Sequence, residues 1–376
     1  MTDATTVRLA TRGSDLALRQ AATVKDTLED RGSRVELVEV DTTGDQLRDE
    51  LIHRLGKTGA FVRSLDEKVI EGDVDAAVHS MKDVPTEQPD ELVVAGVPKR
   101  ASPGDVLVTP DETTLADLPA GATVGTSSLR RTAQLLAERS DLDIRPLRGN
   151  VDTRVEKLLA PGLQAEHEER TEEVKIREET ADEDYEFPYD QSVEEWFDSR
   201  SEIERQALGR EVDTAYDAIV LARAGLERAG LLHHVEYRDL PATTFVPAPG
   251  QGALAITAVD SEFAVKLSDV LDHPRSRAET TVERTILAEL GGGCVAPMGV
   301  HAVLQGSVIR TTVRVLDREG AKEVRATRDL DAQRHIEAAQ SFGAALAEQG
   351  ADDLIAAAKR GAGNDDAATV QGDTDE

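Results

Sequence analysis

Four arginines stand where a strand-like run of the sequence gives way to a helix-like one. Arg130 and Arg131 follow Thr126-Ser127-Ser128 at the start of a helical stretch, Arg148 closes the next strand, and Arg154 lies one turn into the following helix. Hydroxyls and free backbone N–H groups at a helix start bind anions, and guanidinium groups strengthen such a site. Ligands of open α/β sheets bind where strands end, so these arginines predict an anion site. The alternative is a surface carboxylate partner for each arginine.

Two further strand ends carry polar side chains. Arg12 and Ser14 repeat the strand, turn and helix-start arrangement near the N-terminus, although a capping role alone explains Ser14. The run from His79 to Pro85 ends a buried strand with Lys82 beside Asp83, a pair suited to electrostatic or acid/base chemistry. The alternative for this run is an ordinary turn before Pro85.

The chain has one cysteine, Cys294, and three glycines precede it. A single cysteine is a nucleophile, an attachment point or a small buried apolar residue. The glycines at 291–293 supply nothing to pack and let the backbone project the thiol, which argues against the third role. The eight histidines show no paired ligand spacing, so no metal is expected.

The elements that must position these residues alternate between strands and helices. This alternation predicts a mostly parallel sheet covered on both faces. Strands are expected at 7–11, 34–40, 76–78, 92–97, 105–109, 123–126, 144–147, 217–222 and 253–258, with helices at 14–30, 61–70 and 128–138. Beyond Arg275, helical stretches on both sides of 291–293, three strand-like runs between Gly299 and Thr327 and helices to about Lys359 predict an α+β unit.

These patterns divide the chain into three domains. Domain 1 is expected at 1–98 with 253–270, domain 2 at 104–245 and domain 3 at 275–362, with a crossing between the first two at 97–104. An acidic segment at 161–213 reads as a partly helical insertion in domain 2, with an aromatic patch at 185–197 that docks it back. Residues 363–376 are expected to be a disordered tail.

The composition of the 376 residues limits the partners. There are 73 acidic and 43 basic residues, a net charge of −30, which argues against general nucleic-acid binding. Such charge is relieved by salt, which suggests a salt-rich cytoplasm such as that of a halophilic archaeon. One cysteine excludes an internal disulfide, and we expect no signal peptide and no membrane span. The expected location is therefore the cytoplasm, and we separately expect a monomer.

Seven segments, in this order along nearly the whole chain, resemble the motifs of the porphobilinogen deaminase family. They are TRGSDLALRQ at 11–20, AVHSMKDVP at 77–85, GTSSLRR at 125–131, RGNVDTR at 148–154, LARAGLER at 221–228, PAPGQGA at 247–253 and LGGGCVAPMG at 290–299. Each motif is modest, but the ordered set is specific.

The resemblance implies a fold and a reaction. The fold would be α/β, with two doubly wound mixed-sheet domains similar to type II periplasmic binding proteins and a C-terminal α+β domain. Cys294 would hold a dipyrromethane cofactor by a thioether bond. Four porphobilinogen units would be added in turn with loss of ammonia, and hydrolysis would release hydroxymethylbilane for haem synthesis.

The resemblance also implies roles for individual residues. Asp83 would be the catalytic carboxylate, with Lys82 beside it, and would stabilise the azafulvene-like cation as it forms. Cofactor contacts would come from Cys294, Arg12, Ser14, Lys82, Asp83, Thr126, Ser127, Ser128, Arg130, Arg131, Arg148 and Gly149, and substrate contacts from Arg12, Phe61, Arg148, Arg154, Arg228 and Gln251. Thr58 stands where the family has a lysine, so whether Lys57 or Thr58 contacts the substrate stays open.

An alternative interpretation of the sequence assigns it to another class of protein. A two-lobed anion-binding module of the type II solute-binding class, without catalysis, would explain the arginines at the sheet edges. It would not explain Asp83 beside Lys82, nor the glycine-rich loop before Cys294.

Overall fold

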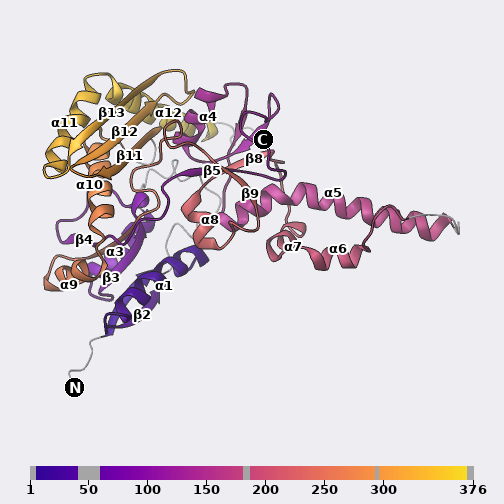
Figure 1. Ribbon diagram of the computed structural model, residues 1–376, viewed down its shortest axis with the longest axis horizontal. Helices are drawn as coiled ribbons and strands as arrows, with labels where there is room; N and C mark the ends of the chain where they lie inside the picture. The colour runs from indigo at the N-terminus through magenta and orange to yellow at the C-terminus, as the bar shows by residue number, and fades with distance from the viewer. Residues whose placement is uncertain (1–5, 41–59, 181–186, 293–295, 371–376) are drawn as a thin grey trace.

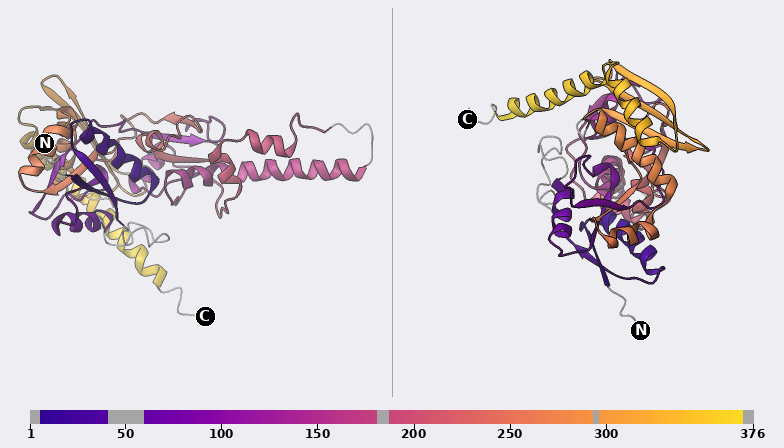
Figure 2. Two further views of the ribbon diagram at one scale, coloured as in Figure 1. Left: turned by 90° about the horizontal axis from the view of Figure 1, so that it is seen from below. Right: turned by 90° about the vertical axis from the view of Figure 1, so that its left-hand side faces the viewer.

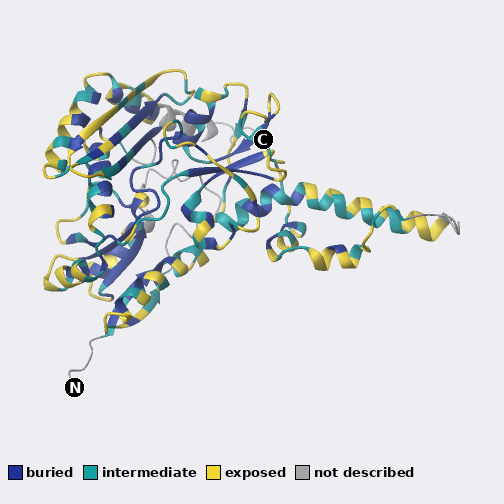
Figure 3. Ribbon diagram, in the orientation of Figure 1, coloured by how far each residue is buried: buried dark blue, intermediate teal, exposed yellow. Residues whose placement is uncertain are grey.

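Three β-sheets, each covered by helices, form the body of the protein (Figure 1). The computed structural model describes residues 6–40, 60–180, 187–292 and 296–370. The central strands are the most buried part of the body, while the edge strands and the helices show mixed exposure (Figure 3). In these ranges no helix is long and apolar enough to cross a membrane.

The first sheet is mixed and is covered on both faces. Its strand order is β2-β1-β3-β10-β4, in which β1 pairs parallel with β2 and β3, while β10 pairs antiparallel with β3 and β4. Side chains of α1 and α9 pack on one face of this sheet and those of α3 on the other. The elements are β1 (Thr6–Thr11), α1 (Asp15–Glu29), β2 (Arg34–Glu39), α3 (Ala60–Ile70), β3 (Ala76–Ser80), β4 (Leu92–Gly96), β10 (Leu254–Val259) and α9 (Glu262–Leu271).

The second sheet repeats this topology. Its order is β7-β6-β8-β5-β9, with three parallel strands followed by β5, which is antiparallel to both of its neighbours. Both sheets therefore have the same arrangement, and the predicted α/β fold class with two mixed-sheet lobes is confirmed. The elements are β5 (Asp105–Thr109), β6 (Thr123–Gly125), α4 (Leu129–Glu138), β7 (Asp143–Arg145), α5 (Val151–Thr180), β8 (Ala218–Ala222), α8 (Arg223–Ala229) and β9 (Glu236–Asp239).

The third sheet is antiparallel, in the order β11-β12-β13, and packs against α10, α11 and α12. The elements are α10 (Pro274–Glu289), β11 (Met298–Gln305), β12 (Val308–Leu316), β13 (Glu323–Asp331), α11 (His335–Ala347) and α12 (Ala351–Val370). One expectation for this part was wrong, because a strand and not a helix follows residues 291–293. Residues 363–370, expected in the tail, belong to α12, which points away from the body (Figure 2).

A long arm projects from the second lobe (Figure 1). Its main element is α5, which runs through Pro161 although proline removes one backbone donor. The helices α6 (Val193–Ser199) and α7 (Glu202–Leu208) lie beside it, and each begins with a serine capping box. Trp196 is 1% exposed, and the Arg170 guanidinium lies 4.1 Å from the Tyr189 ring centre and 5.3 Å from that of Trp196. The aromatic residues therefore hold α6 against α5 within the arm, and not the arm against the body as the sequence predicted.

Candidate active site

Asp83 lies directly beyond the end of β3, in one turn of 3-10 helix at Met81–Asp83. Two contacts fix this turn from the segment that precedes β10. The Met81 amide donates to Ala253 O at 3.0 Å, and a Cβ on Gly250 would lie 2.6 Å from Met81 Cγ, so only glycine fits there. Lys82 and Asp83 themselves are exposed. The fold thus presents an adjacent cation and carboxylate to solvent on a rigid turn.

Arg130 and Arg131, in the first turn of α4, both face inwards. Their guanidinium groups bind the Asp105 carboxylate at 2.7 and 2.8 Å, and they are 4% and 6% exposed. Burial alone would raise the pKa of Asp105, but the two guanidiniums outweigh it and hold that pKa well below the usual range. Their predicted contact with the cofactor stays a prediction. Two guanidiniums on one carboxylate leave a net positive charge in this cluster.

Gln251 extends the same cluster to the crossing between the lobes. Its amide nitrogen donates to Asp105 Oδ1 at 2.9 Å and to Pro103 O at 2.6 Å, and its amide oxygen lies 3.4 Å from Arg130 NH2. The side chain is 1% exposed. Because its amide is bound within the protein, Gln251 is placed to hold the crossing, and the predicted substrate contact gains no support from this geometry.

The three hydroxyls before α4 all have local partners. Thr126 Oγ1 accepts from the Ser128 amide at 3.2 Å, and Ser128 is the N-cap of α4. Ser127 exchanges hydrogen bonds with the backbone of Leu147, at 2.7 and 3.1 Å, which ties the end of β6 to the segment that leads to Arg148. These bonds order the loop that carries the arginines. Their direct role in binding stays a prediction.

Arg148 and Arg154 differ from the inward-facing pair because neither forms an ion pair with any described residue. Arg154 Nε donates to Gly149 O at 2.8 Å. Gly149 has φ +112°, and a Cβ there would meet Thr153 at 2.5 Å, so this turn requires glycine. Burial, together with the neighbouring Arg131 charge, lowers the pKa of Arg154 to about 10. A desolvated cation beside a second cation is suited to an anionic ligand.

The remaining predicted residues are spread over the first lobe and the crossing. Ser14 is the N-cap of α1, accepting from the Ala17 amide at 3.4 Å, and Arg12 precedes it. Arg228 donates to Gly252 O at 2.8 Å, and burial lowers its pKa. Phe61 is in the first turn of α3, but its side chain, like Lys57, Thr58 and Cys294, lies outside the described residues.

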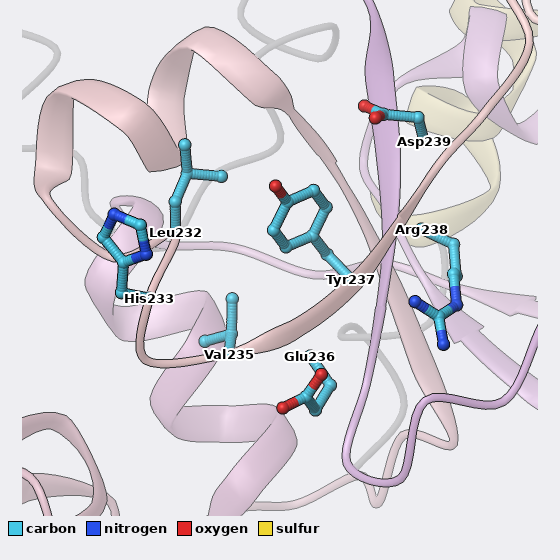
Figure 4. A pocket seen from close by; sticks show the side chains of 7 residues that line it. All are labelled: Leu232, His233, Val235, Glu236, Tyr237, Arg238 and Asp239. Carbon is cyan, nitrogen blue, oxygen red and sulfur yellow. The ribbon is translucent and has the colours of Figure 1, made fainter.

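The structure therefore links the Asp83 turn to the buried arginines through the crossing. From the Asp83 turn, contacts pass through residues 250–252 to Asp105, Arg130 and Arg131, and the charge of Arg131 lowers the pKa of Arg154. A surface pocket beside the edge strand β9, lined by residues between Leu232 and Asp239, includes none of them (Figure 4). It is not the predicted site.

Two clusters were not anticipated from the sequence. One is the cluster around Asp105. The sequence feature that could have indicated it is a charged residue at the start of an otherwise apolar strand, directly after Pro103-Gly104. The other is buried between α3 and the first sheet, where Asp66 Oδ1 lies 3.0 Å from His79 Nε2 and 2.7 Å from Thr257 Oγ1. It ties α3 to β3, the strand that leads into the Asp83 turn.

Comparison with known families agrees with the order of the motifs. A model described as "Porphobilinogen deaminase, dipyromethane cofactor binding domain" matches residues 7–166 and 201–266. The model for the C-terminal domain of the same enzyme matches residues 278–350. The chain belongs to the porphobilinogen deaminase family. The deaminase model does not match residues 167–200, whose described part, 167–180 and 187–200, belongs to the arm.

Individual relatives carry the same name. "Probable porphobilinogen deaminase" of Halobacterium salinarum is 56% identical, over 93% of this chain and 97% of the relative. "Porphobilinogen deaminase" of Desulforudis audaxviator is 36% identical, over 95% and 99% of the two chains. Among solved structures, the methionine binding protein MetQ aligns with 13% identity and a TM-score of 0.35 over 70% of this chain and 87% of its own, too low to carry an argument.

Proposed function

We propose that this deaminase-family chain is a hydroxymethylbilane synthase in which Asp83 is the catalytic carboxylate. Four porphobilinogen molecules are joined head to tail with loss of ammonia, and hydrolysis releases the linear tetrapyrrole. Family membership supports the reaction and makes the chain a transferase of tetrapyrrole biosynthesis. The position of Asp83, exposed on a turn fixed by Met81 and Gly250, supports its assignment.

The observation that best supports this function is the positive charge around Arg154, which has no carboxylate partner among the described residues. Porphobilinogen and the dipyrromethane bear carboxylate side chains, and guanidiniums bind carboxylates in a bidentate manner with permanent charge. Arg148 and Arg154 have no carboxylate partner among the described residues, and the Arg131 charge bears on Arg154. In a chain of net charge −30, this local excess of cations fits a polycarboxylate group. The residues present therefore fit the cofactor that the family implies.

In this arrangement the chain's own groups have three tasks. Arg148 and Arg154 bind the acetate and propionate side chains, with Arg12 and Arg228 as further proposed contacts. A dipyrromethane bound to Cys294 would supply the free pyrrole carbon to which the first substrate unit is joined. Asp83 accepts hydrogen bonds from pyrrole N–H groups and stabilises the positive charge that develops on the substrate as ammonia leaves. Lys82, adjacent and exposed, offers a cation to the substrate carboxylates.

The test compares Asp83→Asn with the unchanged protein. Because Asp83 is exposed, the variant should fold with an unchanged melting temperature, while kcat falls by several orders of magnitude. Intact mass should show the unchanged protein heavier than its sequence by two pyrrole units, and Cys294→Ala should lack that addition. Near-normal turnover of Asp83→Asn, or full activity with an unmodified Cys294, would contradict the assignment.

A non-catalytic anion-binding module explains the arginines but not family membership, so it is not favoured. We further propose that the enzyme is a monomer in a salt-rich cytoplasm. Its acidic composition and the Halobacterium relative support the salt-rich part. We also propose domains at 1–98 with 253–270, 104–245 and 275–362, in accord with the three sheets.

A further inference from the structure

Arg284 reaches from α10 to the backbone just beyond Asp83. Its NH1 donates to Val84 O at 2.8 Å and its NH2 donates to Pro85 O at 2.7 Å. These two carbonyls belong to the residues that leave the Asp83 turn. One guanidinium therefore binds two consecutive peptide carbonyls. It fixes both the position and the orientation of the segment that follows Asp83.

The electrostatics of Arg284 are unusual for an arginine that holds two elements together. It forms no ion pair with any described residue, and burial lowers its pKa. Arg277, on the same helix, also reaches the first lobe, donating to Val94 O at 3.0 Å, but it pairs with Asp272 at 2.6 Å. A partly desolvated cation with neutral partners contributes little net stability. Its main effect is therefore to fix the geometry of the segment that it binds.

The C-terminal end of α10 shows why the geometry of this segment matters. The helix ends at Glu289, and Cys294 follows ten residues after Arg284 in the sequence. Arg284 thus joins the helix that leads to the cysteine to the turn that carries the carboxylate. We propose that Arg284 is a positioning residue that fixes the Asp83 turn relative to α10, the helix that precedes Cys294 in the sequence, an inference that rests on the proposed function of Asp83.

The experiment compares Arg284→Met, Arg284→Lys and the matched control Arg277→Met. A displacement of about 1 Å in a catalytic group costs roughly 100-fold in rate. We therefore expect Arg284→Met to lower kcat by about 100-fold and change KM by less than about threefold. Arg284→Lys keeps the charge and one donor and should recover part of kcat. Arg277→Met should keep kcat, since its contact lies on β4 and not beside Asp83.

Each variant is also followed by thermal melting and by intact mass, so that kcat refers to folded, cofactor-loaded protein. If Arg284→Met does not fold, Arg284→Lys alone decides, through a lowered kcat at an unchanged KM. A normal kcat in the loaded Arg284 variants, or equal losses of kcat and melting temperature in Arg277→Met and Arg284→Met, would overturn the inference. A normal kcat in Asp83→Asn would instead reject the proposed function, so the two failures are distinguishable.

Discussion

Asp105 neutralises part of the charge of two buried arginines, and its own carboxylate is 0% exposed. Removing one partner from a buried ion pair leaves an uncompensated charge and costs about 3–5 kcal/mol. We expect Asp105→Asn to lower the free energy of unfolding by this amount at pH 7, measured in urea. An effect below about 1 kcal/mol would contradict the pairing of Asp105 with Arg130 and Arg131.

The same carboxylate predicts a dependence on pH. Its pKa is lower in the folded protein than in the unfolded chain, so its stabilising contribution is complete above the unfolded value of about 3.9. That contribution is lost as the pH falls towards the folded pKa. The difference in unfolding free energy between the unchanged protein and Asp105→Asn should therefore shrink below about pH 4. A difference that grows on acidification would reverse the sign of the argument.

Arg154 should behave in the opposite way, because it serves binding more than stability. Charged hydrogen bonds are worth about 1.5–3 kcal/mol, so Arg154→Met should lower kcat/KM by roughly 10- to 100-fold. Since the folded protein disfavours this cation, its loss should leave the free energy of unfolding unchanged or raised. Arg145, near the same sheet edge but 58% exposed and paired with Asp143, is the control. Equal effects of Arg145→Met and Arg154→Met would contradict a specific anion site.

At the scale of elements, the arm can be tested apart from the body. The deaminase family model omits residues 167–200, and Gln164 already binds the backbone of Leu208 and Arg210 at 3.1 and 2.8 Å. Replacing 167–200 by a short glycine-rich linker should leave cofactor loading complete and kcat within about threefold. Loss of both, in protein that still folds by circular dichroism, would assign the arm a part in catalysis.

Trp196, the only tryptophan, reports on the arm directly. Around α6 the arm packs on one buried indole and a few cation–π contacts, whereas the core cluster of each lobe contains more than ten buried apolar side chains. Small units with few buried contacts open at lower free energy than the rest of a protein. Tryptophan fluorescence should therefore change at a lower urea concentration than far-ultraviolet circular dichroism. Coincident transitions would show that the arm unfolds with the body.

Local signals predicted the frame of this fold. Ser14 and Ser128 cap the helices that their sequence context indicated, and β5 has the predicted bounds. The uninterrupted course of α5 through Pro161 was missed, because composition alone reads an acidic, proline-containing stretch as irregular. The three strands β11, β12 and β13 match the runs predicted after Gly299, but the helix expected directly after residues 291–293 was wrong, because a short apolar run fits helix or strand equally well.

The site was predictable only in part, for a related reason. Motif order identified Arg130, Arg131, Arg148 and Arg154, but not which of them face inwards. That distinction depends on Asp105, whose contact with Arg130 joins residues 25 positions apart. Arg284 and Pro85 are 199 positions apart, and no local pattern connects them. Hydrogen-bond and ion-pair partners that only the tertiary fold brings together cannot be predicted from residue spacing along the chain.

At the scale of the whole molecule, the chain has a large negative net charge, whereas the proposed site needs positive charge to bind carboxylates. The chain has ten lysines among its 43 basic residues, so arginine supplies the other 33, and the net charge is −30. Like charges spread over the surface destabilise the folded state, and an acidic exterior repels a polycarboxylate substrate. Salt reduces both effects, because the Debye length falls from about 10 Å at 0.1 M to about 3 Å at 1 M.

We therefore expect the melting temperature to rise steeply as KCl increases from 0.1 M to 1 M, and less beyond that, once screening is nearly complete. Sucrose at matched osmolality is the control, since it stabilises by exclusion from the protein surface without screening charge. A rise in KCl that sucrose does not reproduce would establish repulsion between surface carboxylates as the cause. No rise in KCl, or an equal rise in sucrose, would mean that the acidic surface does not limit stability, and the proposed salt-rich environment would lose its physical support.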